Sequence, residues 1–171
     1  MLVHAANFLY WWGIPIVQFL GAMFIFDTWQ YFLHRLMHVN KFLYKQIHSW
    51  HHRLYVPYAF GSLYNHPLEA LILDSIGALV TEWVTGMSKR QIMLLFTLSN
   101  LKTVDDHCGY KLPWDPLQWL TGNNADYHDI HHQAIGIKSN FSQPLFMHWD
   151  VLLGTRMTRE DIERRRRNKA E

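Results

Sequence analysis

The sequence predicts an all-α protein with integral membrane helices and a cytosolic helical cap that carries a histidine-rich site for two metal ions. Two observations predict this class: a long uncharged apolar segment near the first residue, and three histidine clusters at helical spacing. The chain has 171 residues, of which 49% are hydrophobic and 15% aromatic, so we expect a single domain over 1–171 with ample core.

Residues 5–26, AANFLYWWGIPIVQFLGAMFIF, form the predicted membrane span. They carry no charge and are long enough to cross a bilayer as one helix. Trp11 and Trp12 precede Trp29 by a helical length of roughly 27 Å, which matches the separation of two interfacial aromatic belts. A signal peptide is the alternative, but the segment lacks a basic start and a cleavage site and is longer than the apolar region of a signal peptide.

Residues 68–104 predict a hairpin of two apolar helices that turns at Gly86. The arms carry three acidic residues, so they form either a tilted membrane hairpin or a buried helix pair. We favour membrane insertion, because an even number of crossings returns the later histidines to the side of the earlier ones. Lys89 and Arg90 at the turn oppose the positive-inside tendency, so a shallow or re-entrant hairpin is the alternative. The acidic residues are Glu69, Asp74 and Glu82.

The last segment, 158–171, reads TREDIERRRRNKAE and predicts an exposed basic helix. A solvated tail and a contact with anionic lipid headgroups both fit the run from Arg164 to Arg167. We expect no nucleic-acid partner, because one arginine run beside a membrane span has a nearer partner in lipid.

The three histidine clusters are HRLMH, HSWHH and HDIHH. Spacings of three and four place imidazoles on one face of a helix. Chance predicts only about 0.06 copies of HxxHH at this histidine frequency, so two copies are strong support for a metal site. Eight clustered imidazoles exceed the needs of one ion and indicate two neighbouring metals. These histidines are His34, His38, His48, His51, His52, His128, His131 and His132.

Imidazole binds zinc, copper, iron and nickel, so ligand type does not name the metal. The Glu-x-x-His pattern of soluble di-iron bundles does not occur, and the remaining chemical fit is an oxygen-activating di-iron centre at a membrane surface. A zinc hydrolase is disfavoured because neither HxxHH motif carries the general-base glutamate of HExxH. An inactive metal-binding paralogue fits the ligands equally well.

Further polar residues near the clusters are candidate ligands or groups that orient ligands. We favour His107 as a ligand, oriented by the carboxylate of Asp105 or Asp106. His66 precedes Pro67, so a ligand and a turn-capping residue are equally plausible.

Asp129 lies within HDIHH, and Asn124 and Tyr127 lie just before it. Each of the three either orients an imidazole or caps the helix. We expect the single cysteine, Cys108, to serve packing, because a thiolate would be the odd member of an imidazole set. His4 and His148 lie outside the clusters and are expected to be bystanders.

The order HRLMH, HSWHH, YNHPLE, DDHCGY, YHDIHH and WDVLLGTRM resembles the fatty acid hydroxylase and sterol desaturase superfamily over about residues 27–157. Within it, HSWHHRLYVPYAFGSLYNHPLEALILD and NNADYHDIHHQAIGIKSNFSQP are similar to fungal sphinganine C4-hydroxylases. By this resemblance the eight clustered histidines and His107 are metal ligands, and His66 matches the family's HPLE segment less decisively.

The resemblance implies a multi-pass enzyme of the endoplasmic reticulum membrane whose histidines face the cytosol. It would use two iron ions and O2 to hydroxylate C4 of the sphingoid base of sphinganine or dihydroceramide, with a sterol or other lipid as the alternative substrate. Electrons would come from NADPH through a separate cytochrome b5 and its reductase, because the chain has no haem domain or dinucleotide motif. Family members usually begin with additional helices, so metal binding is a firmer expectation than turnover.

Overall fold

The structure is a computed structural model that describes residues 1–170. That part of the chain is helical and contains no β-strand, only an isolated bridge between Gly122 and Phe146. The elements are α1 (Leu2–Phe8), η1 (Leu9–Gly13), α2 (Ile14–Val39), α3 (Lys41–Gln46), η2 (His48–Arg53), η3 (Ala59–Gly61), α4 (Pro67–Ala70), η4 (Leu71–Ile76), α5 (Gly77–Thr85), α6 (Lys89–Asp106), α7 (Pro116–Thr121), α8 (Ala125–His132), α9 (His148–Leu152) and α10 (Arg159–Ala170).

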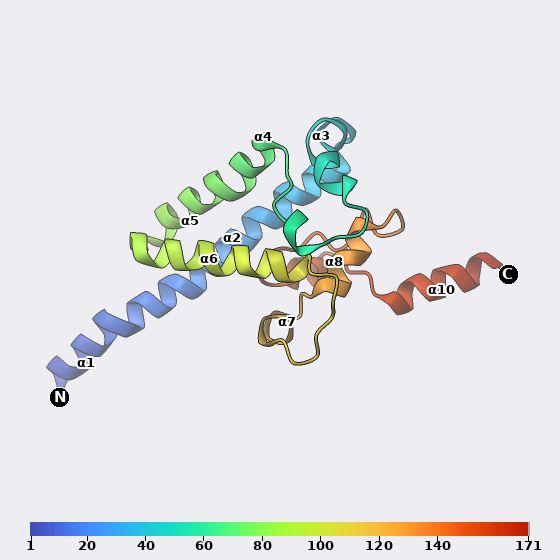
Figure 1. The fold of residues 1–171 in the computed structure, drawn as a ribbon. Helices are drawn as coiled ribbons and strands as arrows, with labels where there is room; N and C mark the ends of the chain where they lie inside the picture. Colours follow the sequence, from blue (N-terminus) through green and yellow to red (C-terminus); the bar gives the residue numbers. More distant parts are fainter. Residues whose placement is uncertain (171) are drawn as a thin grey trace.

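The N-terminal helix is continuous through α1, η1 and α2, from Leu2 to Val39. Its first half projects from the rest of the molecule (Figure 1), and its most apolar 18-residue window is 6% buried within the chain. It is long and apolar enough to cross a membrane, the one helix of residues 1–170 that meets this description. The predicted span at 5–26 therefore lies in a helix that continues into the cap with His34 and His38, as expected.

The predicted hairpin at 68–104 is present as a helical hairpin. One arm consists of α4, η4 and α5, the other is α6, and both pack against α2 (Figure 1). Gly86 ends α5 with φ of 62°, a left-handed conformation that glycine adopts without steric cost. Ser88 then starts α6 by accepting from the Gln91 amide N–H, while the Gln91 side chain accepts from the Ser88 amide N–H. Whether the hairpin crosses a membrane stays a prediction.

The π-helical segment η4 is pinned to α2 by side chains that use its backbone carbonyls. Trp29 Nε1 donates to the Ile72 carbonyl at 3.0 Å, and Gln30 Nε2 donates to the Leu73 carbonyl at 3.2 Å. A π-turn departs from regular α-helical hydrogen bonding, and here side chains engage two of its carbonyls. Because Gln30 lies one turn before His34 on α2, these contacts fix the hairpin beside the first histidine cluster.

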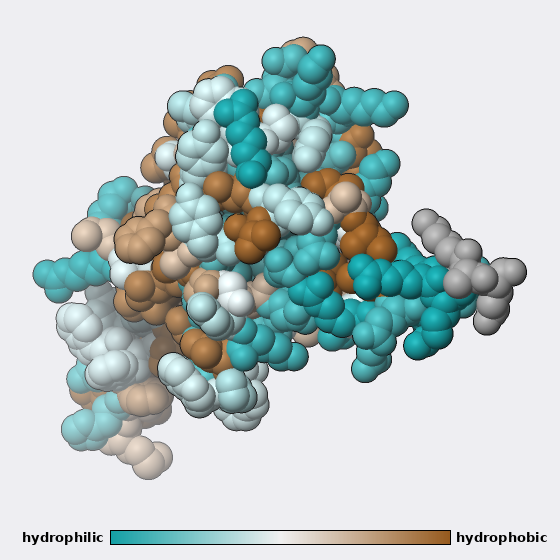
Figure 2. Space-filling view, turned by 45° about the vertical axis from the view of Figure 1, so that its right-hand side comes forward, coloured by the Kyte–Doolittle hydropathy of each residue, from teal (hydrophilic) through white to brown (hydrophobic). Residues whose placement is uncertain are grey.

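Large apolar side chains remain exposed on the hairpin. Leu79, Trp83 and Met93 are 62%, 85% and 70% exposed. Hydrophobic residues lie across the body of the molecule in Figure 2, whereas α10 beside the grey chain end is hydrophilic. A lipid environment would cover this apolar surface, in agreement with the predicted membrane location of the hairpin.

The loop that follows α8 is held by Asp150 of α9, which is fully buried. Its carboxylate accepts from the amide N–H groups of Phe141 and Ser142 at 3.1 and 2.6 Å. The hydroxyls of Thr155 and Tyr127 also donate to it. One carboxylate therefore fixes the backbone of residues 141–142, whose Phe141 carbonyl contacts the ring of His34.

Candidate metal centre

Nine histidines converge in the cap as two groups, and within each group one potential ligand atom per residue lies within 4.8 Å of all the others. All nine are buried except His52, which is half-buried. These are the nine histidines predicted as ligands. The first group is His34, His38, His48, His52 and His131, and the second is His51, His107, His128 and His132.

Each HxxHH motif contributes to both groups. His48 and His52 of the second cluster belong to the first group, while the intervening His51 belongs to the second group. The third cluster does the reverse, since His128 and His132 belong to the second group and His131 to the first. The extra histidine of HxxHH thus links neighbouring sites, which explains why this motif occurs in place of a simple HxxxH pair.

The helix type differs between the motifs. HDIHH forms the last residues of the α-helix α8, as its spacing predicts. HSWHH forms the short 3₁₀ helix η2 instead of an α-helix. A 3₁₀ helix is more tightly wound, yet His48 and His52 still bring their Nε2 atoms to 3.1 Å.

Four Nε2 atoms of the first group form a closed ring of short contacts. His34 lies 3.1 Å from His48 and 3.2 Å from His38, and His52 lies 3.1 Å from His48 and 3.2 Å from His38, all measured between Nε2 atoms. Ligands about 2.1–2.2 Å from one ion are about 3.0–3.1 Å apart at right angles and about 3.4–3.6 Å apart in a tetrahedron. The four distances are therefore short enough for all four atoms to bind one ion, and His131 is a fifth candidate donor whose buried Nε2 has no partner.

The Nε2 atoms of the second group lie close together, and successive atoms are in contact. His128 lies 3.0 Å from both His107 and His132, and His107 lies 3.3 Å from His51. His107 comes from the end of α6, so the hairpin supplies this ligand while η2 and α8 supply the others.

Five of the nine rings donate their Nδ1 proton to an acceptor that the fold holds in place. A neutral imidazole that is protonated at Nδ1 has a lone pair at Nε2. Two such lone pairs face each other across 3.1 Å between His34 and His48, an arrangement that repels unless a cation lies with them. The donor set therefore fits metal ions. The donor–acceptor pairs are His34 with Phe141 O (2.7 Å), His48 with Glu69 Oε1 (2.6 Å), His107 with Thr103 O (2.7 Å), His131 with Ser139 O (2.7 Å) and His132 with Leu54 O (2.9 Å).

The electrostatics also favour the metal-binding form of the ligands. Burial lowers the pKa of His51, His128 and His131 well below 6.5, and neighbouring imidazoles lower it further. Burial likewise lowers the pKa of His107 to about 4. These rings are therefore neutral near pH 7 and keep their lone pairs available.

Two carboxylates predicted to orient His107 have other partners. Asp105 accepts from the Gln118 side chain at 2.8 Å, and Asp106 pairs with buried Lys102. The expectation that either orients His107 is wrong, because the Thr103 carbonyl one turn earlier on α6 accepts from its Nδ1.

His66 and Asp129 both make local structural contacts in this structure. His66 lies outside both groups and caps α4, with its Nδ1 accepting from the Leu68 amide N–H at 3.1 Å. Asp129 pairs with Arg159 of α10 and accepts from the Gln133 side chain at 2.7 Å, so it orients no imidazole. Asn124 caps α8.

Glu69 is the site residue that the sequence analysis missed. It was counted only as a charge within an apolar segment, yet it is 2% exposed and accepts from the His48 ring. The available signal was its place in HPLE, in the first turn of a helix beside the histidine clusters. A carboxylate in an apolar helix needs a buried partner, and histidine is the partner this chain offers.

The family model for fatty acid hydroxylases matches residues 19–155 of this chain. The chain belongs to the fatty acid hydroxylase family. It is similar to proteins named sphingolipid C4-hydroxylase sur2 of Schizosaccharomyces pombe (58% identity, 90% of this chain and 51% of the relative) and sphinganine C4-monooxygenase 1 of Arabidopsis thaliana (59%, 82% and 54%). It is also similar to the very-long-chain aldehyde decarbonylase GL1-9 of Oryza sativa subsp. japonica (55%, 89% and 59%). The chain spans about half the length of these relatives, and no solved structure matches it.

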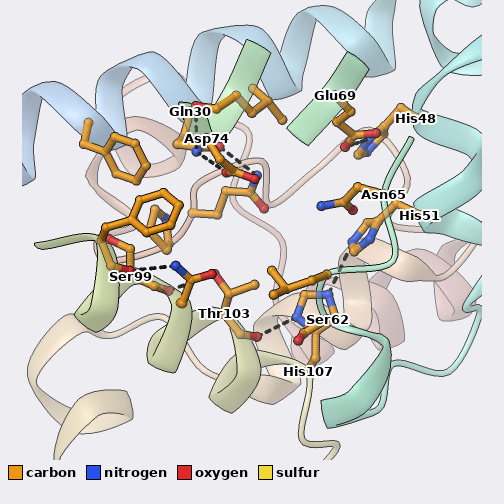
Figure 3. A pocket seen from close by; sticks show the side chains of 17 residues that line it. Gln30, His48, His51, Ser62, Asn65, Glu69, Asp74, Ser99, Thr103 and His107 are labelled. Carbon is orange, nitrogen blue, oxygen red and sulfur yellow. Dashed lines mark hydrogen bonds and ion pairs between the residues drawn. The ribbon is translucent and has the colours of Figure 1, made fainter. Parts of the chain in front are cut away.

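In this member of the family a cavity leads to the two histidine groups (Figure 3). It lies between α2, the η4 segment and α6, and His48, His51 and His107 line it beside Glu69. Residues of both groups therefore border the same space.

Proposed function

We propose that the protein is an O2-dependent di-iron monooxygenase that hydroxylates C4 of the sphingoid base of sphinganine or dihydroceramide. The observation that carries this proposal is the pair of buried histidine groups, whose Nε2 atoms converge beside a cavity. Similarity to relatives named sphingolipid C4-hydroxylase and sphinganine C4-monooxygenase supports the substrate class.

The number of buried imidazoles supports two ions over a single structural zinc, because structural zinc binds four ligands. Nine neutral imidazoles leave two divalent ions with a high net positive charge. Bound iron would supply the redox chemistry that reduces O2 and breaks an unactivated C–H bond. We propose that the nine histidines hold these ions.

The protein's own residues would orient the metal-binding imidazoles, position the lipid and exclude water from the site. Glu69 and the backbone carbonyl of Phe141 hold His48 and His34 by their Nδ1 atoms, so the rings cannot rotate away from the metals. The cavity walls would hold the lipid so that one carbon meets the histidine groups.

A monooxygenase needs electrons, and we propose that they come from NADPH through cytochrome b5 and its reductase. We also propose a multi-pass location in the endoplasmic reticulum membrane, with the histidines on the cytosolic side. The apolar helix Leu2–Val39 and the exposed apolar residues of the hairpin support a membrane location.

The test is to express the chain in cells that lack sphingoid C4-hydroxylation and to measure phytosphingosine. We expect product from the wild type and none from His131→Ala. A well-expressed, iron-loaded wild type without C4 product would contradict the proposal. Sterol and long-chain aldehyde substrates are assayed in parallel, because one relative at 55% identity is named an aldehyde decarbonylase. One zinc ion per chain would overturn the di-iron assignment.

A further inference from the structure

The cavity beside the histidines contains a carboxylate that the metal site does not use. Asp74 lines it from η4, and its Oδ1 accepts from Gln30 Nε2 at 3.0 Å. Figure 3 shows Gln30 and Asp74 on the side of the cavity away from His107. Within residues 1–170, no lysine, arginine or histidine forms an ion pair with Asp74.

A carboxylate at this depth is costly unless a partner offsets its desolvation. Asp74 is half-buried in η4, between buried Leu73 and exposed Ser75, and Gln30 offers it one neutral donor. Ionisable groups in apolar helices face the interior and mark sites that bind a ligand. The missing partner is a cation or a strong N–H donor, because a carboxylate accepts and does not donate.

Two further polar atoms on the cavity wall lack partners. Ser99 on α6 is 4% exposed, and its hydroxyl has no hydrogen-bond partner. Glu69 is 2% exposed, and its Oε2 is likewise unpartnered while Oε1 holds His48. Buried polar atoms are rarely left unpaired, so both are available to pair with a polar ligand that enters the cavity.

The remaining wall is apolar. Phe26, Leu73, Phe96 and Pro144 line the same cavity as Asp74. A space with polar atoms on one part of its wall and aromatic or aliphatic groups on another suits an amphiphile. Its polar head would meet Asp74 and Ser99.

We infer that Asp74 binds the amino group of a long-chain amino alcohol and so determines that this site takes a nitrogen-bearing lipid. The inference rests on the proposed function and deepens it. In a sphingoid base the nitrogen is on C2, two carbon–carbon bonds from C4. The inference requires that the cavity, about 40 Å³ in this structure, widens on binding, so that one molecule places its nitrogen at Asp74 while C4 faces the histidines that line the same cavity. Gln30 is the positioning residue, because its side-chain amide fixes the Asp74 carboxylate.

The test compares two probes that differ in one group. Purified protein in detergent is titrated with sphinganine and with 1,3-octadecanediol, which lacks the C2 nitrogen, and affinity is read from ligand-induced quenching of tryptophan fluorescence. A charge-assisted contact in a desolvated cavity predicts that wild type binds sphinganine about tenfold or more tightly than the diol. In D74N we expect sphinganine affinity to fall to that of the diol, with diol affinity unchanged.

Glu163→Gln is the matched control, because it makes the same chemical change on the exposed tail helix. We expect it to keep the wild-type preference. Equal wild-type affinity for the two probes overturns the inference, even if D74N fails to fold. A folded D74N that keeps the preference overturns it as well.

Binding is measured without turnover, so this inference and the proposed function fail separately. A protein that prefers the amine but forms no C4 product contradicts the proposed function alone. A protein that forms C4 product with the same KM for sphinganine in wild type and D74N contradicts the role of Asp74 alone. We expect D74N to raise KM by about tenfold with a smaller change in kcat.

Discussion

Oε1 of Glu69 lies 2.6 Å from Nδ1 of His48, and the two side chains are 3% and 1% exposed. The carboxylate fixes the tautomer and direction of the imidazole and increases its basicity. We expect Glu69→Gln to weaken metal binding at the first histidine group about 10- to 100-fold. Chelator competition with the metal-loaded protein measures the change.

Glu163→Gln, on the exposed tail helix, is the control and should hold metal like the wild type. If Glu69→Gln retains metal as tightly as this control, Glu69 does not support the site. The substitution keeps the side-chain volume, so a loss of metal would not come from an added cavity.

His131 tests whether the first group is a separate metal site. It is buried and contributes the fifth donor of that group, whereas His148 lies outside both groups and stacks on Phe24 with ring centroids 5.1 Å apart. We expect His131→Ala to lower the metal content from about two ions per chain towards one. Elemental analysis of purified protein gives the ratio, and His148→Ala should retain both ions. Equal metal content in the two variants would show that His131 is not a ligand.

Helical spacing was sufficient to predict the histidine groups. His34 and His38 lie one turn apart on an α-helix, as the interval of four requires; the rarity of HxxHH indicated a metal site, and the number of clustered imidazoles indicated two ions. The apolar runs likewise predicted the N-terminal helix and the hairpin, because turn chemistry at Gly86 is a local property of the sequence.

The acceptors that orient the rings could not be predicted in this way. Backbone carbonyls of Phe141 and Ser139 hold His34 and His131, and any residue type provides a carbonyl. Proximity along the chain suggested Asp106 for His107, but its carboxylate pairs with Lys102 on its own helix. Such choices depend on tertiary packing, which a single sequence does not reveal.

Asp150 links the stability of the cap to the site, since it holds the loop that supplies the Phe141 carbonyl. Asp150→Ala leaves three buried donors and the half-buried Thr155 hydroxyl without their acceptor, and we expect it to lower the free energy of unfolding by about 3 to 5 kcal/mol. Tyr127→Phe removes one donor and should cost about 1 kcal/mol. Urea unfolding in detergent micelles, followed by far-UV circular dichroism, compares the two. Equal losses would contradict the central role of the carboxylate.

Membrane topology can be tested with single cysteines, because Cys108 is the one cysteine of the chain. In a Cys108→Ser background, Arg90→Cys places a thiol at the exposed hairpin turn and Arg164→Cys places one on the tail helix. If the hairpin crosses the bilayer, an impermeant maleimide added to sealed, cytosol-side-out microsomes labels the tail and leaves the turn unlabelled until detergent is added. Labelling of both thiols in sealed vesicles would mean that the hairpin is shallow or re-entrant.

We expect the labelling pattern of a crossing hairpin. The side chains of Leu79 and Trp83 are exposed, and a crossing hairpin would bury them in lipid instead of water.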